Sequence, residues 1–450
     1  MSEIYERNRF YELGRKYILW VYKQYYDEII VQGAENIPPE GVPVIFAANH
    51  LNALMDSLAV LTLPPAQKPK IYLSRADLFK LPAPIVQFIR FAKLMPAYRI
   101  RDGYENLGKN KESFEEADRA LLNNACLVIM PEGNQGEEKR IRPLVKGIFR
   151  IAFSAQQKMP EHKSVMIVPV GIDMGHLIKF GKHLIINIGK PINVADYLAM
   201  YADNQARAIN TLREHLKKSM EELVPVLETE SYYETYQTAV EVCQLEMLQK
   251  LQLPDNTLNR FKAEKLLGEK LMAIEKEQPE KMEQLRSVCK SYKKRLIKRN
   301  LRTGNLEKPI PKAGNLFLSH LLTDLLLLVS VPGFLLNILP FKAPVLFPRI
   351  FGVEYKGFYS SVYYGASLVL FPLFYTLQAI LLICLLALPW WSFFVLMPLQ
   401  YLAGKLAFFS YRRLKSNMAD QRMYLLAKRK KEKYRHMKEL RAQIIKLLFT

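Results

Sequence analysis

The chain has 450 residues, of which 50% are hydrophobic and 24% are charged. This composition excludes both a disordered polypeptide and a channel made only of membrane spans, and the length leaves room for two or three domains. The four cysteines are scattered without the spacing of a metal site or a disulfide framework, which favours a reducing compartment.

The net charge of +21 is concentrated in two blocks. Residues 290–312 carry a net charge of +8 and residues 412–450 a net charge of +10, and the two blocks flank the most apolar part of the chain. This arrangement is typical of the cytoplasmic flanks of membrane segments and of contacts with anionic lipid. Basic runs also bind nucleic acids, but that function would not explain why the blocks flank an apolar region, so we expect membrane lipids and no nucleic acid as partners.

The first 27 residues lack the apolar core of a cleavable signal peptide. Residues 4–27 instead mix aromatic and aliphatic side chains with arginine and lysine. The pattern predicts an interfacial amphipathic helix over residues 1–27 that lies along the bilayer surface. The alternative is an ordinary amphipathic helix docked on the domain that follows.

Residues 28–203 alternate between strand and helix patterns, which predicts an α/β domain in layers. The expected strands are Glu28–Gln32, Val44–Ala48, Lys70–Ser74, Ala125–Met130 and Val165–Ile172, and the expected helices cover Leu51–Leu61, Asn106–Asn123 and a segment that begins at Lys146. Function is expected on the loops at the strand ends.

His50 directly follows the buried strand Val44–Ala48 and precedes Asp56 by six residues. A histidine at a strand-to-helix junction with an aspartate nearby suggests a general base whose imidazole is oriented by a carboxylate. On a continuous helix, six residues would separate the two side chains by about 120°. His50 must therefore lie in the turn before the helix and fold back toward Asp56. A structural hydrogen-bonding pair is the alternative.

Two further groups of polar residues are candidates for substrate binding. Arg99 and Arg101 form a basic pair at a turn, which could bind a phosphate through planar guanidinium groups or remain a solvated charge pair. Glu132 follows the strand that ends at Met130, beside Gly133, which permits close approach of a backbone.

Four segments now stand in a recognisable order: N-H-L-N-A-L-M-D (49–56), P-A-Y-R (96–99), M-P-E-G (130–133) and V-P-V-G (168–171). Together they resemble the four blocks of the glycerolipid acyltransferase family, which includes glycerol-3-phosphate, lysophosphatidate and other lysophospholipid acyltransferases. The likeness covers roughly residues 25–200. It implies an α/β acyltransferase domain with a mixed sheet flanked by helices.

The resemblance also implies the reaction, which is transfer of a fatty acyl group from acyl-CoA or an acyl carrier protein to a glycerol hydroxyl. The acceptor would be glycerol 3-phosphate or a lysophospholipid, with lysophosphatidate favoured. His50 would be the general base and Asp56 would hold its imidazole. The residues implied in substrate binding are Asn49, Asn52, Arg99, Arg101, Glu132, Gly133 and Lys146. No metal and no cofactor beyond the acyl donor is expected.

Two departures from the family pattern bear on the acceptor. Five residues separate His50 from Asp56 where the family usually has four. This longer form, with Asn52 two places after the histidine, resembles members that act on glycerol phosphate or dihydroxyacetone phosphate. The P-E-G block is followed by Asn-Gln-Gly instead of the usual Thr or Ser and then Arg, and Arg140 and Arg142 are candidates to replace the missing arginine.

Residues 204–313 are rich in Glu and Lys with a helical period, interrupted at Pro225, Pro254 and Pro279. They predict a charged helical region on the cytosolic side. Their charges more often make a solvated surface than a binding site.

Residues 314–411 predict a membrane-embedded helical region. Leu316–Leu339 and Ala366–Leu388 are each long enough to cross a bilayer core of about 30 Å. We expect a two-pass transmembrane hairpin, a third stretch at Trp390–Phe409 that is re-entrant or interfacial, and a basic cytosolic tail over residues 412–450. The hypothesis is an integral membrane acyltransferase facing the cytoplasm, with a bacterial inner membrane favoured and the oligomeric state left open. The alternative is a non-catalytic membrane adaptor with the same fold.

Overall fold

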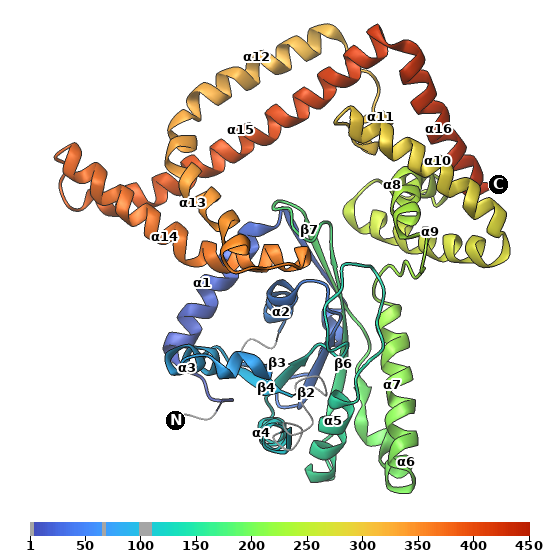
Figure 1. Cartoon of the computed structure of the whole chain (residues 1–450). Helices are drawn as coiled ribbons and strands as arrows, with labels where there is room; N and C mark the ends of the chain where they lie inside the picture. Colours follow the sequence, from blue (N-terminus) through green and yellow to red (C-terminus); the bar gives the residue numbers. More distant parts are fainter. Residues whose placement is uncertain (1–3, 65–68, 99–109) are drawn as a thin grey trace. The chain divides into compact units, whose positions relative to one another are not determined.

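The computed structural model describes residues 4–64, 69–98 and 110–450 and divides the chain into two compact units (Figure 1). The first, which we call the sheet unit, comprises Met1–Val226 together with the distant segment Tyr355–Ser361. The second, the helical unit, comprises Leu227–Glu354 and Val362–Thr450.

The sheet unit is built on a mixed sheet with the strand order β1-β7-β6-β2-β5-β3-β4, and β8 pairs with β6. β6 runs antiparallel to β7 and β8, whereas the other pairs are parallel. This confirms the expected mixed sheet. The strands are β1 (Glu28–Gln32), β2 (Val44–Ala48), β3 (Lys70–Arg75), β4 (Leu94–Ala97), β5 (Cys126–Ile129), β6 (Met166–Met174), β7 (His183–Ile188) and β8 (Ile192–Asn193).

The central strand β2 positions the candidate site. All five of its residues are buried, as is typical of a parallel strand covered on both faces. It pairs in parallel with β5 on one side and β6 on the other, so that Ile45 lies opposite both Leu127 and Ile167. The carboxyl ends of the three strands therefore meet at one edge of the sheet.

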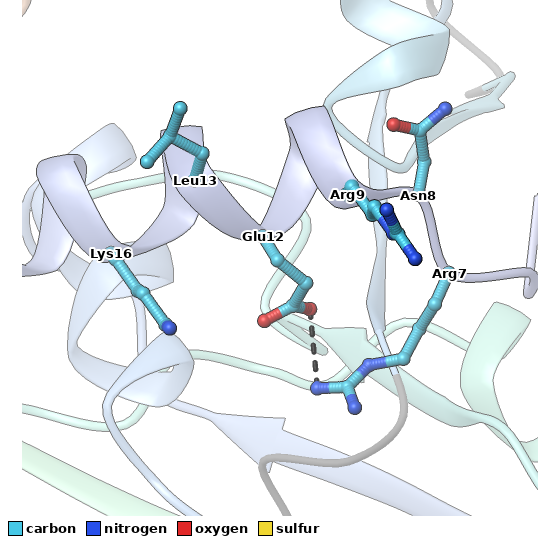
Figure 2. A pocket seen from close by; sticks show the side chains of 6 residues that line it. All are labelled: Arg7, Asn8, Arg9, Glu12, Leu13 and Lys16. Carbon is cyan, nitrogen blue, oxygen red and sulfur yellow. Dashed lines mark ion pairs between the residues drawn. The ribbon is translucent and has the colours of Figure 1, made fainter.

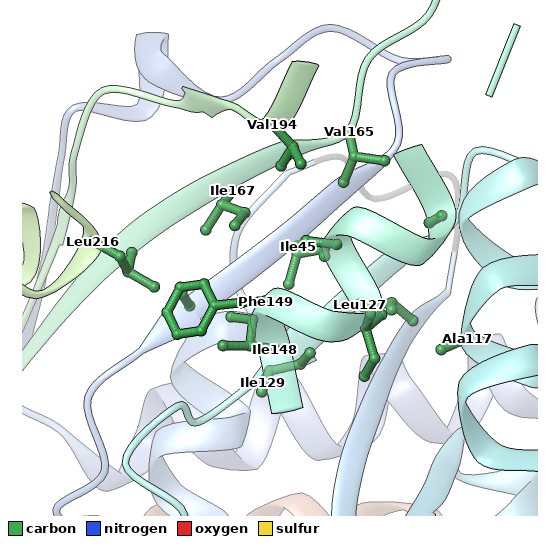
Figure 3. Close-up of a cluster of buried hydrophobic side chains, with 14 of the residues drawn as sticks. Ile45, Ala117, Leu127, Ile129, Ile148, Phe149, Val165, Ile167, Val194 and Leu216 are labelled. Carbon is green, nitrogen blue, oxygen red and sulfur yellow. The ribbon is translucent and has the colours of Figure 1, made fainter. Parts of the chain in front are cut away.

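Helices cover both faces of the sheet (Figure 1). On one face, α5 (Gly147–Lys158) and α7 (Gln205–Glu221) join the sheet in a continuous apolar core that includes Ile45, Phe149 and Leu216 (Figure 3). On the other face, α2 (Ala53–Leu61) packs against β2 and β6. The remaining helices of the unit are α1 (Arg9–Tyr25), η1 (Ala34–Asn36), η2 (Ala76–Lys80), α3 (Ala83–Phe91), α4 (Asn110–Leu122), η5 (Val194–Tyr197) and α6 (Leu198–Asp203).

The sheet unit extends beyond the domain end expected at residue 203. The helix α7 buries Leu212, Leu216 and Met220 in the same core as the sheet, so the unit continues to Val226. The sequence placed this helix in the charged region because its outer face is rich in Glu and Lys.

The N-terminal helix α1 has features of both alternatives considered for it. Asn8 caps its start, and Tyr11 and Tyr22 are buried against the sheet unit, where the Tyr22 hydroxyl donates a hydrogen bond to the carbonyl oxygen of Met55 at 2.8 Å. Phe10 and Leu13 remain 77% and 69% exposed on the same helix. The helix is docked and also presents an apolar face; its contact with a bilayer stays a prediction.

The helical unit contains α8 (Tyr233–Lys250), α9 (Thr257–Glu277), α10 (Pro279–Lys298), α11 (Thr303–Glu307) and α16 (Lys431–Phe449) around a second apolar core. The prolines at 254 and 279 separate helices as predicted, and Pro279 occupies the first turn of α10. The interpretation of residues 412–450 as a tail needs correction. Met437 and Ile444 of α16 are fully buried in this core, because α16 has an apolar stripe along one face in addition to its basic residues.

The helices of the apolar region differ in their boundaries from the expected spans, and the number that cross a membrane stays a prediction. By length and composition, three of its helices could cross a membrane: α13 (Val331–Ile350), α14 (Tyr359–Leu385, preceded by the turn η6, Lys356–Phe358) and α15 (Ser392–Arg429). The shorter apolar helix α12 (Ala313–Val329) precedes them. The first expected span is divided at Ser330, because Pro332 begins a new helix. The third expected stretch falls largely within α15, which continues through Pro398.

Candidate active site

His50 lies at the carboxyl edge of the sheet, in the irregular turn between β2 and α2. Its backbone N–H donates to Oε1 of Glu132 at 2.8 Å, and its carbonyl oxygen accepts hydrogen bonds from the backbone N–H of Gly136 at 3.1 Å and from Nη2 of Arg142 at 2.6 Å. The loop after β5 thus fixes the backbone of the histidine from both sides. The side chain is 18% exposed, so it remains accessible.

The imidazole of His50 folds back onto Asp56, as the sequence required of a functional pair. Nδ1 of His50 lies 2.9 Å from Oδ2 of Asp56. The same carboxylate oxygen accepts the backbone N–H of Asn52 at 2.6 Å, and the Asp56 side chain is fully buried. A carboxylate held in this way fixes the ring so that its other nitrogen, Nε2, is the one that would exchange a proton with a ligand.

The turn that carries this pair is strained. Ala53, at the first position of α2, has φ of 26°, a backbone conformation that side-chain-bearing residues rarely adopt. Such conformations persist where the surroundings over-determine them, and they concentrate at functional sites. The hydrogen bonds to Glu132, Arg142 and Asp56 are part of those surroundings.

Glu132 is a buried structural partner of the histidine loop. Besides its bond to His50, its Oε2 accepts the backbone N–H of Arg142 at 3.0 Å and forms an ion pair with Nε of Arg142 at 2.8 Å. Burial raises the pKa of Glu132, and the Arg142 guanidinium together with the two backbone N–H donors opposes that rise. Both carboxylate oxygens are occupied by the protein itself.

Arg142 is the main residue whose role the sequence did not settle, since it was only one of two candidates for a missing arginine. Its guanidinium bridges His50 and Glu132, and Gly136 makes the space for it: a Cβ at Gly136 would lie 1.8 Å from Nη1 of Arg142. The unusual glycine after the P-E-G block therefore fits the arginine. Arg140, the other candidate, pairs with Glu138 at 3.1 Å on the surface.

Asn49 and Asn52 use their side-chain amides on the protein. Asn49 exchanges hydrogen bonds of 3.0 and 2.6 Å with the carbonyl and N–H of Ile172, which extends the pairing of β2 with β6. Nδ2 of Asn52 donates to the carbonyl of Leu177 at 2.7 Å and to Oγ of Ser360 at 2.6 Å. These contacts support the loop geometry; a contact of either amide with substrate stays a prediction.

Of the four remaining expected binding residues, the structure describes Gly133 and Lys146. Gly133 has φ of 67° and faces Val145, which favours glycine there. Lys146 is exposed at the start of α5, where the helix N-terminus favours anions. Arg99 and Arg101 lie outside the described residues.

Asp173, at the same sheet edge, was not singled out from the sequence. Its buried carboxylate pairs with Nζ of Lys139 at 2.8 Å and lies 3.8 Å from Nε2 of His183. Burial raises the pKa of Asp173, but its interactions with Lys139 and His183 outweigh burial and lower it to about 2. Its burial among apolar β6 residues left no periodic signal. A small cavity of about 10 Å³, with room for about one water, adjoins Asp173 and Asn49.

A separate hollow of about 420 Å³ lies over the first turns of α1, lined by Arg7, Asn8, Arg9, Glu12, Leu13 and Lys16 (Figure 2). Arg7 and Glu12 form an ion pair of 3.2 Å across it. Its basic rim and exposed leucine are features of a surface that meets anionic lipid.

The residues that the structure describes contain no group of three or more His, Cys, Asp or Glu side chains placed to hold a metal ion. The expectation of a metal-free reaction stays a prediction. The described geometry offers a histidine with a carboxylate behind it and a buried carboxylate–guanidinium pair beneath it. This arrangement can remove a proton from a hydroxyl and orient the histidine that does so.

Comparison with known proteins confirms the resemblance. Residues 28–173 match the family model described as Acyltransferase. Glycerol-3-phosphate O-acyltransferase 2 of Saccharomyces cerevisiae is 30% identical over 146 residues, which cover 32% of this chain and 19% of the relative. 1-Acyl-sn-glycerol-3-phosphate acyltransferase BAT2 of Brassica napus, a chloroplastic protein, is 24% identical over 42% of this chain and 50% of its own length. The chain thus covers only part of the length of either relative.

Among solved structures, the crystal structure of the 1-acyl-sn-glycerophosphate acyltransferase PlsC from Thermotoga maritima is similar to this chain. The two are 20% identical, with a TM-score of 0.32, and the match covers 48% of this chain and 83% of that one.

Proposed function

We propose that this chain, whose residues 28–173 match the family model described as Acyltransferase, is a membrane-bound O-acyltransferase of the glycerolipid type. It moves a fatty acyl group from a thioester to a hydroxyl of glycerol 3-phosphate or lysophosphatidate. The observation that carries the proposal is the 2.9 Å contact between His50 and Asp56 in a turn fixed by Glu132.

The reaction needs a base because an alcohol is a weak nucleophile near neutral pH. Nε2 of His50 takes the proton of the acceptor hydroxyl as its oxygen attacks the thioester carbonyl. The carbon–sulfur bond then breaks, and the departing thiolate takes up the proton from the imidazolium. Asp56, held by the backbone N–H of Asn52, stabilises the positive ring between these two events.

The acceptor phosphate needs cationic partners that orient the hydroxyl toward His50, which makes the attack effectively unimolecular. Arg142 is engaged by His50 and Glu132, so it supports the turn and does not serve as this partner. We assign the phosphate to Arg99, Arg101 and the exposed Lys146 at the start of α5. Lysophosphatidate and glycerol 3-phosphate share the phosphate, and the yeast and plant relatives carry names for each of these two acceptors.

The apolar helices and the basic blocks support an integral membrane enzyme whose site faces the anionic leaflet of the cytoplasmic side, and we favour a bacterial inner membrane. The acceptor and donor can then be supplied from the bilayer surface and the cytoplasm respectively.

The test is a panel of reactions with the full-length protein in liposomes of phosphatidylethanolamine and phosphatidylglycerol. Radiolabelled palmitoyl-CoA, or palmitoyl attached to an acyl carrier protein, is offered with glycerol 3-phosphate, lysophosphatidate or lysophosphatidylcholine. We expect acceptor-dependent release of thiol with the two phosphate monoesters. Thioester that is never consumed with any acceptor would instead support the non-catalytic adaptor.

A further inference from the structure

The segment Tyr355–Ser361 belongs to the sheet unit although about 300 residues separate it from His50 in sequence. It connects the apolar helix α13 to the first turn of α14, and the family match ends at residue 173, far before it. Ser360 is fully buried and Ser361 is 4% exposed. Two serines this deeply buried require hydrogen-bond partners, and those partners identify what the segment does.

The partners of the two serines are in the turn that carries the histidine. Oγ of Ser361 lies 2.9 Å from Oδ1 of Asn52 and accepts the backbone N–H of Leu54 at 3.1 Å. Oγ of Ser360 accepts from Nδ2 of Asn52 at 2.6 Å and donates to the carbonyl of Leu177, also at 2.6 Å. Both ends of the Asn52 amide are thereby fixed.

The hydrogen bonds of the two serines affect the position of Asp56 through Asn52. The backbone N–H of Asn52 donates to the carboxylate oxygen of Asp56 that faces His50, and the strained Ala53 follows Asn52 directly. The side chain of Asn52 caps no helix donor, and the N–H of Leu54 in the first turn of α2 is satisfied by Ser361. Without the two serines, Asn52 would keep its bonds to the Leu177 carbonyl and to Asp56 but would lose the partner of its Oδ1 and one partner of its Nδ2.

The rest of the segment lies against the same loops. The N–H of Gly357 donates to Oε1 of Glu137 at 3.0 Å, in the loop that carries Glu132 and Arg142. Burial raises the pKa of Tyr355 to about 12, with further contributions from the negative charges of Glu137 and Asp56 and an opposing one from Arg142.

We propose that Ser360 and Ser361 are positioning residues of the acyltransferase reaction. They hold Asn52, and through it Asp56, so that the imidazole of His50 is oriented toward the acceptor hydroxyl. The sequence order places these residues in the first turn of an apolar helix, so the catalytic turn is completed by the start of a candidate membrane span. The proposal rests on the proposed function.

The test compares Ser360→Ala, Ser361→Ala and the double variant with the wild type and with His50→Ala. Ser154→Ala is the matched control, because it removes a serine hydroxyl bonded to Asp118 at 2.7 Å elsewhere in the sheet unit. We expect kcat to fall about 10- to 100-fold in the double variant, as for a small displacement of a catalytic group, while KM for donor and acceptor changes less than about threefold. The single variants should fall between the double variant and the control.

Hydrogen exchange gives a second readout that does not depend on activity. We expect the amides of residues 52–56 to exchange faster in the serine variants than in Ser154→Ala. If the double variant does not fold, Ser361→Ala decides the question alone. An unchanged kcat, or a raised KM with an unchanged kcat, overturns the positioning role. Such a result leaves the proposed function intact as long as the wild type is active and His50→Ala is not. An inactive wild type would refute the proposed function itself, and the exchange data would then report only on the structure of the turn.

Discussion

Replacing Arg142 by Met tests the buried support beneath the histidine. The change removes the ion pair of 2.8 Å with Glu132 and the hydrogen bond of 2.6 Å to the carbonyl of His50. The Glu132 side chain is 1% exposed, so its charge would remain buried without its cationic partner. Breaking such a pair costs roughly 3–5 kcal/mol, and loss of the hydrogen bond to the His50 carbonyl adds about 1 kcal/mol.

The cost should depend on pH. Arg142 is the largest influence opposing the burial that raises the pKa of Glu132, so the variant should raise that pKa further. A carboxyl whose pKa is higher in the folded than in the unfolded state destabilises the fold above that pKa, and protonation on acidification relieves the cost. The difference in free energy of unfolding between wild type and variant should therefore be about 3 kcal/mol or more at pH 8 and should shrink toward about 1 kcal/mol as the pH falls and Glu132 takes up a proton.

Urea unfolding of the sheet unit within the full chain in detergent, followed at several pH values, measures this difference. Adding Glu132→Gln to the Arg142→Met variant should recover part of the lost stability at pH 8, because the uncompensated charge is gone. Arg142→Lys should be intermediate, since it keeps the charge but loses the planar fork. A loss in free energy of unfolding that is equal at pH 5 and pH 8, and that Glu132→Gln does not reduce, would refute the buried-pair account.

Three further changes follow from the same contacts. Gly136→Ala should lower the melting temperature and the acyl-transfer rate together, because a Cβ there would meet the guanidinium of Arg142 at 1.8 Å, an overpacking that costs about 1–3 kcal/mol; an unchanged melting curve would contradict it. Asp173, whose pKa is lowered to about 2, contributes stability that is present above about pH 4 and is lost as the pH falls toward 2. Asp173→Asn should therefore flatten this part of an acid-unfolding curve. Lys139→Met should lower the stability at neutral pH, because it removes the cationic partner of Asp173. Tyr355→Phe deletes a buried hydroxyl that has no hydrogen-bond partner among the described residues, so calorimetry should detect no loss of stability, and a loss of more than about 1 kcal/mol would reveal an unrecognised partner.

The sequence predicted most of the sheet because its central strands are continuous apolar runs with clear ends. β1, β2 and the position of His50 agree with the structure. The strand β7 was missed because His183 and Asn187 interrupt its apolar run and no motif marks it. The order of the strands was not accessible either, since pairing of β1 with β7 joins residues about 150 positions apart.

For the site, the local sequence predicted the His50–Asp56 pair and its geometry but not the residues that hold the pair in place. The His50 and Asp56 pattern required the histidine to sit in the turn before the helix, and it does. The roles of Arg142 and Gly136 depend on a loop that folds back on the histidine carbonyl, which no spacing encodes. The role of Ser361 was harder still to predict, because a short polar residue at the start of an apolar helix is usually no more than a helix-start signal.

The apolar region could be located from composition but not divided correctly. Leucine-rich runs predict helices without stating where one ends, so the break at Ser330 and the extension of α15 to Arg429 both differed from the expected boundaries. The apolar stripe of α16 was hidden by the basic residues on its other face, whose charge dominated the interpretation.

The transfer rate of His50→Ala tests the central claim most directly. Full-length wild type, His50→Ala and His162→Ala, whose histidine is exposed in a surface loop, are compared in the same liposomes with labelled palmitoyl thioester and glycerol 3-phosphate or lysophosphatidate. We predict that His162→Ala keeps the wild-type rate and that His50→Ala loses at least about 100-fold in kcat, the contribution expected of a general base. Transfer by His50→Ala at the rate of the control would contradict the account.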